Sequence, residues 1–321
     1  MSGLTAARTL IDQGVDVTLL DKGRGLGGRV ATRWMGDRDH IKGRWDHGAQ
    51  FATFRSTALI EDLKKWNAWD ILDPWIPSYS NPDLPRNRPL EGMNAFPKAL
   101  GQGLTIHRRA RISSIRKDGV TWTLESEEGK TFTANHVICT LPVPQLLDLF
   151  QASDLELAES ESDSLHSVSY ERGLTLLAEL DGPSGLGHNG YVRTVTGILE
   201  SIIDQHQKSI SGAHTLVANA NATFSLEWYD RDRATAGSVI RAAVQEKISS
   251  QIISVQVHGW KFAKAIKRIP EAYLRLDNGL FVAGDGFEAG DIDVPADLHP
   301  RIESAMLSGR AAAAGLLASI F

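Results

Sequence analysis

The residues best suited to chemistry lie at the start of the chain, where a glycine and an acid have a spacing that suits a nucleotide. Ser2-Gly3-Leu4 opens a helical pattern, and the short apolar run after it ends at Asp21. A glycine at a helix start lets the helix pack close to a strand, the helix N-terminus holds a diphosphate, and an acid about 20 residues on binds ribose hydroxyls. We therefore expect Ser2, Gly3 and Asp21 to contact a dinucleotide. A glycine and an acid in purely structural roles fit the same pattern.

The complete fingerprint, G-x-G-x-x-G after a strand, is only partly present. The sequence begins at what would be its last three positions. Either the recorded start is internal to a longer native chain, or the opening strand is absent. In the second case we expect an exposed sheet edge beside Val17, poor stability and weakened affinity for the dinucleotide.

A run of glycines and basic residues follows the acid. Lys22, Arg24 and Arg29 are interleaved with four glycines, including Gly27 and Gly28. Glycines allow a phosphate to approach the backbone, and guanidinium groups supply charge for it. We expect these five residues to line the diphosphate; a flexible surface loop is the alternative.

Other kinds of site and partner are disfavoured by the composition. The single Cys139 excludes an internal disulfide and a cysteine-built metal site, and the ten histidines show no metal-ligand spacing, so we expect no metal. The net charge of −5 disfavours nucleic acid, and no apolar run reaches the roughly 18 to 20 residues of a membrane span. We expect a monomer in the reducing cytoplasm, with neither nucleic acid nor membrane as partner.

The elements that must position these residues follow from the hydrophobic pattern. A length of 321 residues corresponds to about two domains. The pattern predicts helices over Leu4–Gln13, Ala234–Ile248 and Ile302–Ile320, strands over Val15–Leu20, His136–Leu141, Leu174–Leu180, Leu216–Ala222 and Leu280–Ala283, and a hairpin of Thr121–Leu124 with Thr131–Phe132. Half of the 12 prolines fall between Pro74 and Pro97, which predicts a long surface connection there.

Ser2 to Arg29 resembles the flavin amine oxidase superfamily, whose pattern is a Rossmann unit, an acid and then G-G-R. Within that superfamily the closer resemblance is to bacterial renalase-like proteins, which are FAD-dependent oxidoreductases. The blocks that carry it are Asp46-His47-Gly48-Ala49-Gln50-Phe51, Gly92 to Leu100, Val137 to Gln145, Gly259-Trp260-Lys261-Phe262-Ala263, Gly284-Asp285 and Arg301 to Gly309. They span nearly the whole chain in the right order. Gly259 departs from the pattern, since it stands where the family has an arginine.

The resemblance implies an α/β fold, with a discontinuous Rossmann-like FAD-binding domain and an inserted α+β substrate domain, the two-domain architecture of amine oxidases. The expected FAD-binding domain comprises residues 1–55, 97–148 and 275–321. The expected substrate domain comprises residues 56–96 and 149–274.

The resemblance also implies roles for single residues. Gly48, Ala49 and Gln50 would pass close to the flavin ring, Ile112 would meet adenine, and Gly284 with Asp285 would bind ribityl or ribose hydroxyls. Ile302 would begin the last helix, whose N-terminal end stabilises negative charge on the reduced flavin. Gln50 and Trp260 are the expected catalytic-pocket residues. Glu303 either faces the cofactor or points at solvent.

The function implied is oxidation of a dihydronicotinamide, above all a misreduced isomer of NAD(P)H, by non-covalent FAD with oxygen as acceptor. The implied partners are thus a small-molecule substrate and oxygen. An amine as hydride donor is the alternative within the same chemistry. A flavin-free binding or scaffold protein is the alternative if the incomplete fingerprint abolishes FAD binding.

Overall fold

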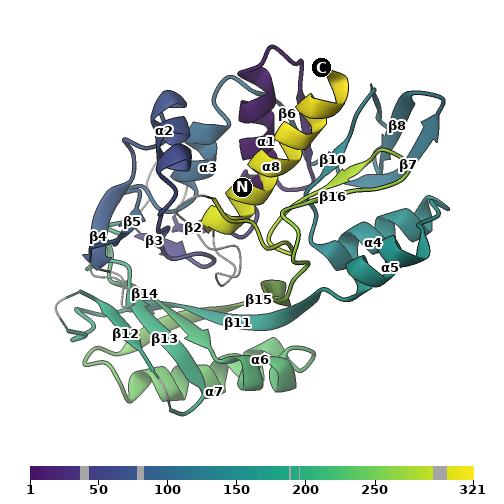
Figure 1. Ribbon diagram of the computed structural model, residues 1–321. Helices are drawn as coiled ribbons and strands as arrows, with labels where there is room; N and C mark the ends of the chain where they lie inside the picture. The colour runs from purple at the N-terminus through teal and green to yellow at the C-terminus, as the bar shows by residue number, and fades with distance from the viewer. Residues whose placement is uncertain (37–42, 78–82, 188, 195, 292–301) are drawn as a thin grey trace.

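The computed structural model describes residues 1–36, 43–77, 83–187, 189–194, 196–291 and 302–321. Arg301, the first residue of the last sequence block, lies outside the described residues. Two parts face each other, with the N-terminus of the chain near their boundary (Figure 1).

Two helices from opposite ends of the chain pack side by side in the first part, α1 (Ser2–Ile11) and α8 (Ile302–Ile320) (Figure 1). They approach closely because α8 has a glycine at the crossing: a Cβ at Gly309 would lie 2.2 Å from the carbonyl oxygen of Ser2. Gly14, which follows α1, has a φ of 79°, as expected of a glycine that ends a helix. The predicted last helix is confirmed, and the first begins two residues earlier than its periodicity indicates.

Short parallel strands lie beside these helices. β1 (Thr18–Asp21) pairs with β6 (Thr105–Arg108), and β10 (Ile138–Cys139) pairs with β17 (Phe281–Val282), next to the antiparallel β16 (Leu274–Arg275). Within the described ranges β1 has β6 as its one strand partner, so the two sheets stay separate. Val17 and Ile138 both pack against one apolar cluster, which includes Leu10 of α1 and Leu316 of α8. The parallel pairing agrees with the expected Rossmann-like domain.

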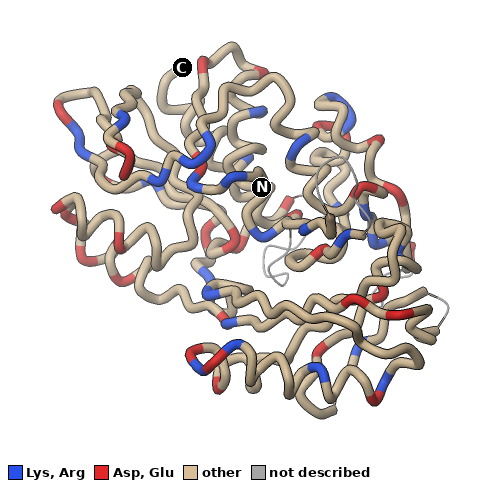
Figure 2. Tube along the Cα trace, turned by 180° about the vertical axis from the view of Figure 1, so that it is seen from behind, with Lys and Arg blue, Asp and Glu red and all other residues tan. Residues whose placement is uncertain are grey.

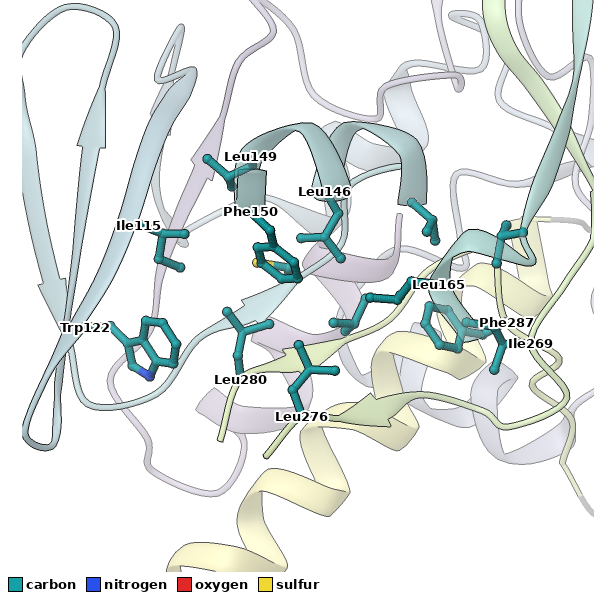
Figure 3. Packing of buried hydrophobic residues seen from close by; sticks show 14 of the residues in the cluster. Ile115, Trp122, Leu146, Leu149, Phe150, Leu165, Ile269, Leu276, Leu280 and Phe287 are labelled. Atoms are coloured by element: carbon teal, nitrogen blue, oxygen red, sulfur yellow. The ribbon is translucent and has the colours of Figure 1, made fainter. Parts of the chain in front are cut away.

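The remaining elements of the first part surround this centre. They are β2 (Thr32–Met35), β3 (Gly43–Asp46), α2 (Thr57–Lys65), α3 (Ala95–Leu100), β7 (Ile112–Asp118), β8 (Thr121–Ser126), β9 (Thr131–Ala134), α4 (Val143–Ala152) and α5 (Glu159–His166). The predicted hairpin is confirmed as β8 and β9. Figure 3 shows the core in which Ile115 of β7 and Trp122 of β8 pack with Leu146 and Phe150 of α4.

The proline-rich stretch is not the surface connection that its composition predicts. It contains an antiparallel pair, β4 (Asp73–Pro77) and β5 (Pro85–Arg88), and the side chains of Arg86, Asn87 and Arg88 are buried. Proline is tolerated here because Pro77 ends β4 and Pro85 begins β5, at positions that need no central ladder donor, while on its other side β5 pairs with Ala52 through Asn87.

The second part is a five-stranded antiparallel sheet in the order β12-β13-β14-β11-β15. Its strands are β11 (Ser169–Leu180), β12 (Tyr191–Arg193), β13 (Leu199–Asp204), β14 (Thr215–Ala220) and β15 (Ile252–Lys267). Helices α6 (Ala222–Trp228) and α7 (Arg233–Gln245) cover one face (Figure 1), where apolar side chains of alternate strand positions meet them. The opposite face looks toward the first part.

Helix α2, expected in the substrate domain, packs in the core of the first part. Leu59 and Leu63 of α2 are fully buried in the same core as Leu4 of α1, Phe96 of α3 and Met306 of α8. The sequence assignment placed residues 56–96 in the substrate domain, because periodicity shows that a helix has an apolar face but not which core that face joins.

Candidate cofactor and substrate site

Charged groups from three distant segments meet at the N-terminal end of α1. Burial, together with the positive charge of Arg29, lowers the pKa of the Met1 amino group to about 6, while Asp21 and Asp285 oppose this shift. Asp21, Arg29 and Asp285 therefore lie within electrostatic reach of the Met1 amino group. The positive end of a helix dipole and a guanidinium are thus brought to one place, as a diphosphate requires.

Arg29 and Asp285 form a bidentate ion pair in this region. Two guanidinium nitrogens donate to the two carboxylate oxygens at 2.6 and 2.7 Å, and Nη1 also donates to the carbonyl of Phe262 at 3.1 Å. Burial lowers the pKa of Arg29, but the Asp285 carboxylate outweighs it and leaves the pKa raised. The pair joins the glycine-rich segment to the turn after β17.

Two of the expected cofactor-binding glycines, Gly27 and Gly48, lie where a side chain would collide. A Cβ at Gly27, whose φ is 102°, would lie 2.5 Å from Pro97, and a Cβ at Gly48 would lie 1.9 Å from the Arg29 carbonyl oxygen. The Ala49 N–H donates to that same carbonyl at 2.9 Å. Gly28 has a φ of 58° and open space around it. The backbone of Gly48 and Ala49 is therefore held directly against Arg29.

Four further residues expected to contact the cofactor, Asp21, Lys22, Arg24 and Ile112, divide into two groups. The Asp21 carboxylate accepts from the Gly23 N–H at 2.7 Å, and the Asp21 carbonyl accepts from the Ala110 N–H at 2.9 Å, which brings the start of β7 with Ile112 close to Asp21. Lys22 and Arg24 are exposed, and Lys22 donates to Gln145 at 2.7 Å. The structure thus brings Asp21 and Ile112 together and leaves Lys22 and Arg24 at the rim.

The first turn of α8 is anchored by its acid. Glu303 is 1% exposed and accepts from the backbone N–H groups of Arg55 and Ser56. The solvent-facing alternative for Glu303 is therefore wrong. Ile302, partly buried, packs against the core of α1, and the Gly284 N–H donates to Ser308 of α8 at 2.9 Å.

Residues Asp46–Phe51, which we call the crossing segment, lie across the face of the five-stranded sheet from one edge to the other. His47 contacts His258 and Trp260 of the edge strand β15, and Phe51 contacts Tyr191 of the opposite edge strand β12. The strands of the sheet thus support the backbone that the resemblance places beside a flavin.

A buried polar network fixes the crossing segment. Lys208 donates to the Asp46 carboxylate at 2.6 Å, and both side chains are 0% exposed. The Gln50 amide donates to the carbonyls of Asp46 and Gly48, and its oxygen accepts from Gln205 at 3.3 Å and Lys208 at 3.4 Å. The protein therefore uses both the donor and the acceptor of Gln50. Sequence reasoning missed Lys208, because nothing in the pattern around a single lysine in a polar loop shows burial.

An aromatic group lies at the β15 end of the crossing segment. The Trp260 indole N–H donates to the His47 carbonyl at 2.9 Å, and the His258 and Trp260 rings lie 4.3 Å apart. Burial, then the positive charges of His258 and Arg33, lower the pKa of His47 to about 4. His47 is therefore neutral, and its buried Nδ1 has no hydrogen-bond partner among the described residues.

The glycine at position 259 also has a structural explanation. A Cβ there would lie 2.6 Å from Nη2 of Arg233, which extends from α7. The Arg233 side chain of α7 thus lies against the position on β15 that Gly259 leaves without a side chain.

These features define a class: a Rossmann-like part that faces a five-stranded antiparallel sheet. The residues fit a flavin dinucleotide on two observations, the electrostatic contact of Arg29 with the N-terminus of α1 and the buried His47 Nδ1, which has no hydrogen-bond partner among the described residues. In the described ranges no group of acids, histidines and cysteines could hold a metal, and no helix is long and apolar enough to cross a membrane.

Comparison with known proteins gives the family. A family model for flavin containing amine oxidoreductase matches residues 75–245, and one for an NAD(P)-binding Rossmann-like domain matches residues 1–65. Because the first model covers more than half of the chain, this protein belongs to the flavin containing amine oxidoreductase family. It is an FAD-dependent oxidoreductase.

Solved structures share the fold at low sequence identity. A putrescine oxidase triple mutant is 13% identical with a TM-score of 0.69, over 99% of this chain and 97% of that chain. Cyclohexylamine oxidase from Brevibacterium oxydans IH-35A is 12% identical with a TM-score of 0.69 over the same shares. A fatty acid isomerase from P. acnes is 9% identical with a TM-score of 0.68, over 100% of this chain and 96% of that chain. At these identities the likeness concerns the two-domain fold alone.

Proposed function

We propose that this protein oxidises a dihydronicotinamide, in particular a misreduced isomer of NAD(P)H, with FAD as cofactor and oxygen as electron acceptor. The observation that carries the proposal is the crossing segment, since the renalase-like block Asp46–Phe51 spans the substrate sheet from β15 to β12 and packs against Arg29. The other renalase-like blocks support it. An amine is the second candidate donor, favoured by the family match.

Bound FAD supplies a ring that accepts a hydride. The reaction balances as donor, oxygen and one proton giving the oxidised nicotinamide and hydrogen peroxide. The chain has to orient the donor and exclude water rather than supply an acid–base pair, because a hydride passes directly between the two rings.

We assign the diphosphate end to Ser2, Gly3, Arg29, Gly27 and Gly28, around the N-terminus of α1. Asp21 and Ile112 would hold the adenosine end, with Lys22 and Arg24 at the rim. Gly284, Asp285 and Ile302 would face the ribityl chain and the ring.

Gly48 and Ala49 would hold the ring edge by backbone contacts, and Trp260 would form a flat wall of the donor pocket. Gln50 is assigned to positioning, because its amide is occupied by Asp46, Gly48, Gln205 and Lys208. Attachment of FAD would be non-covalent, since burial raises the pKa of the single Cys139 to about 12 and suppresses its thiolate. We expect a monomer in a reducing compartment.

The test is a flavin spectrum followed by anaerobic reduction. Purified protein should be yellow and release FAD on heating, and isomers of NADH should bleach the flavin faster than amines do. Faster bleaching by amines would favour the second candidate. Colourless protein that takes up no added FAD would contradict both and favour a binding or scaffold role.

A further inference from the structure

A small cavity lies at the amino ends of the parallel strands β10 and β17, near the C-terminus of the chain. Its volume is about 180 Å³, and its lining includes Lys117 and Trp122 of the β7–β8 hairpin, His136 before β10, Arg275 of β16, Phe281 of β17 and Ser319 of α8. Figure 1 labels these strands, and Figure 2 shows the same side of the molecule from behind. Gly284 and Asp285, assigned above to the cofactor, follow the carboxyl end of β17. The cavity is therefore separate from the cofactor site.

Two antiparallel strand pairs each place a cation directly opposite an aromatic residue at this cavity. Lys117 of β7 is opposite Trp122 of β8, and Arg275 of β16 is opposite Phe281 of β17. Directly opposite residues share one face of a sheet. Lys117 Nζ lies 5.5 Å from the centroid of the Trp122 ring, and Arg275 Cζ lies 5.7 Å from that of Phe281. Because both aromatic residues are 1% exposed, the strand register holds the two cations against fixed rings.

No carboxylate compensates the charge of these two cations. Lys117 donates to the carbonyl of Asn278, and neither Lys117 nor Arg275 forms an ion pair with a described residue. None of the described residues that line the cavity is acidic. An aromatic ring attracts a cation but carries no net charge, so two positive charges remain. Arg116, next to Lys117 in β7, differs because it pairs with Glu125 at 2.9 Å.

The size and charge of the cavity suit a phosphate group. Pockets for drug-sized ligands have volumes of about 300–1,000 Å³, so this smaller cavity suits one compact group. A phosphate monoester carries a charge of about −1.5 to −2 at pH 7, which balances Lys117 and Arg275. The guanidinium of an arginine binds two phosphate oxygens at once, and a lysine binds phosphate as a point charge. A single carboxylate would leave one of the two positive charges unbalanced.

We propose that this cavity binds a phosphate group, either inorganic phosphate or the monoester end of a small molecule. Lys117 and Arg275 bind its oxygens, while Trp122 and Phe281 hold the two cations in place. Binding joins the β7–β8 hairpin to β16 and β17 and so stabilises the folded protein. The inference does not depend on which hydride donor the enzyme oxidises, because no residue assigned to the cofactor or the donor lines the cavity.

The experiment is isothermal titration calorimetry of the protein with saturating FAD. The ligands are inorganic phosphate and ribose 5-phosphate, and sodium chloride keeps the ionic strength constant so that screening is equal. The cavity variants are Lys117→Met and Arg275→Met. Arg116→Met is the matched control, because it removes one positive charge from the same strand and breaks only an exposed ion pair.

We expect saturable binding in wild type, and a Kd that rises at least about tenfold in each cavity variant but stays unchanged in Arg116→Met. Equal affinity for the two ligands assigns the site to inorganic phosphate, and tighter binding of ribose 5-phosphate assigns it to a monoester. No saturable binding of either ligand overturns the inference. Equal Kd values in the cavity variants and in Arg116→Met overturn it as well. The two cations would then only complement the negative C-terminal end of α8.

A measurement on wild-type protein keeps the inference testable if the cavity variants do not fold. Acetylation of lysines by a water-soluble reagent is followed by mass spectrometry with phosphate or with chloride. At ten times its Kd, phosphate should slow the modification of Lys117 about tenfold. Lys130 is the internal control, because it is 65% exposed and pairs with Glu128 at 3.0 Å. Equal slowing at the two lysines, or none at Lys117, contradicts the inference.

Discussion

The buried pair of Lys208 and Asp46 gives a prediction whose size follows from the structure. Both side chains are 0% exposed and their charged atoms are 2.6 Å apart. In Lys208→Met the Asp46 carboxylate keeps its bonds to the Thr32 hydroxyl and the Met93 N–H but loses its counter-charge. Removing one partner of a buried ion pair costs about 3–5 kcal/mol. We expect the free energy of unfolding to fall by that amount, a large part of the roughly 5–15 kcal/mol typical of a protein.

Urea unfolding followed by tryptophan fluorescence, at fixed FAD concentration, measures this loss. Lys65→Met is the matched control, because Lys65 pairs with Asp12 at 2.8 Å but is 60% exposed, and such a pair contributes at most about 1 kcal/mol. The double variant Asp46→Asn, Lys208→Met removes both charges and should recover about 2 kcal/mol or more of the loss. A loss in Lys208→Met no greater than that in Lys65→Met would refute the reasoning.

Three further predictions concern the site. The pKa of His47 drops from 6.5 to about 4 on folding, so its contribution to the free energy of unfolding is complete above pH 6.5 and is lost as the pH falls toward 4. Urea titrations should show a loss of about 3 kcal/mol over this range. Equal pH slopes for wild type and His47→Gln would contradict the prediction. Gly48→Ala must displace the Arg29 carbonyl and should weaken FAD binding at least about tenfold in a flavin titration, whereas Gly25→Ala, with open space, should not; equal Kd values would count against the packing argument. Arg29→Met should weaken FAD binding by about tenfold or more while the KM of the donor stays constant, and an unchanged Kd for FAD would remove Arg29 from the diphosphate site.

Local features of the fold could be predicted from the sequence because each depends on neighbouring residues. The last helix, the β8–β9 hairpin and the left-handed Gly14 follow from periodicity and turn chemistry. The order of the sequence blocks along the chain also indicates the superfamily.

Other features could not be predicted because they depend on contacts between distant segments. The prolines around β4 and β5 indicated a loop, since no local rule reveals that the two strands pair with each other. The burial of Lys208 and Arg86 depends on residues more than 100 positions away in the chain, Asp46 for Lys208 and Tyr191 for Arg86. The assignment of α2 to the substrate domain failed to anticipate its packing for the same reason.

The crossing segment has a consequence for how a small molecule enters. The crossing segment is bound to the first part by the hydrogen bond from the Ala49 N–H to the Arg29 carbonyl. It is bound to the second part by the contacts of Asp46 with Lys208 and Gln205. Any hinge-like separation of the two lobes would have to break fully desolvated polar contacts, which is too costly to repeat in every turnover. We therefore expect donor and product to exchange at the β12 edge of the sheet, where the rings of Phe51, Trp75 and Tyr191 are partly exposed. Side-chain rearrangement there would suffice, and the two parts would stay in contact.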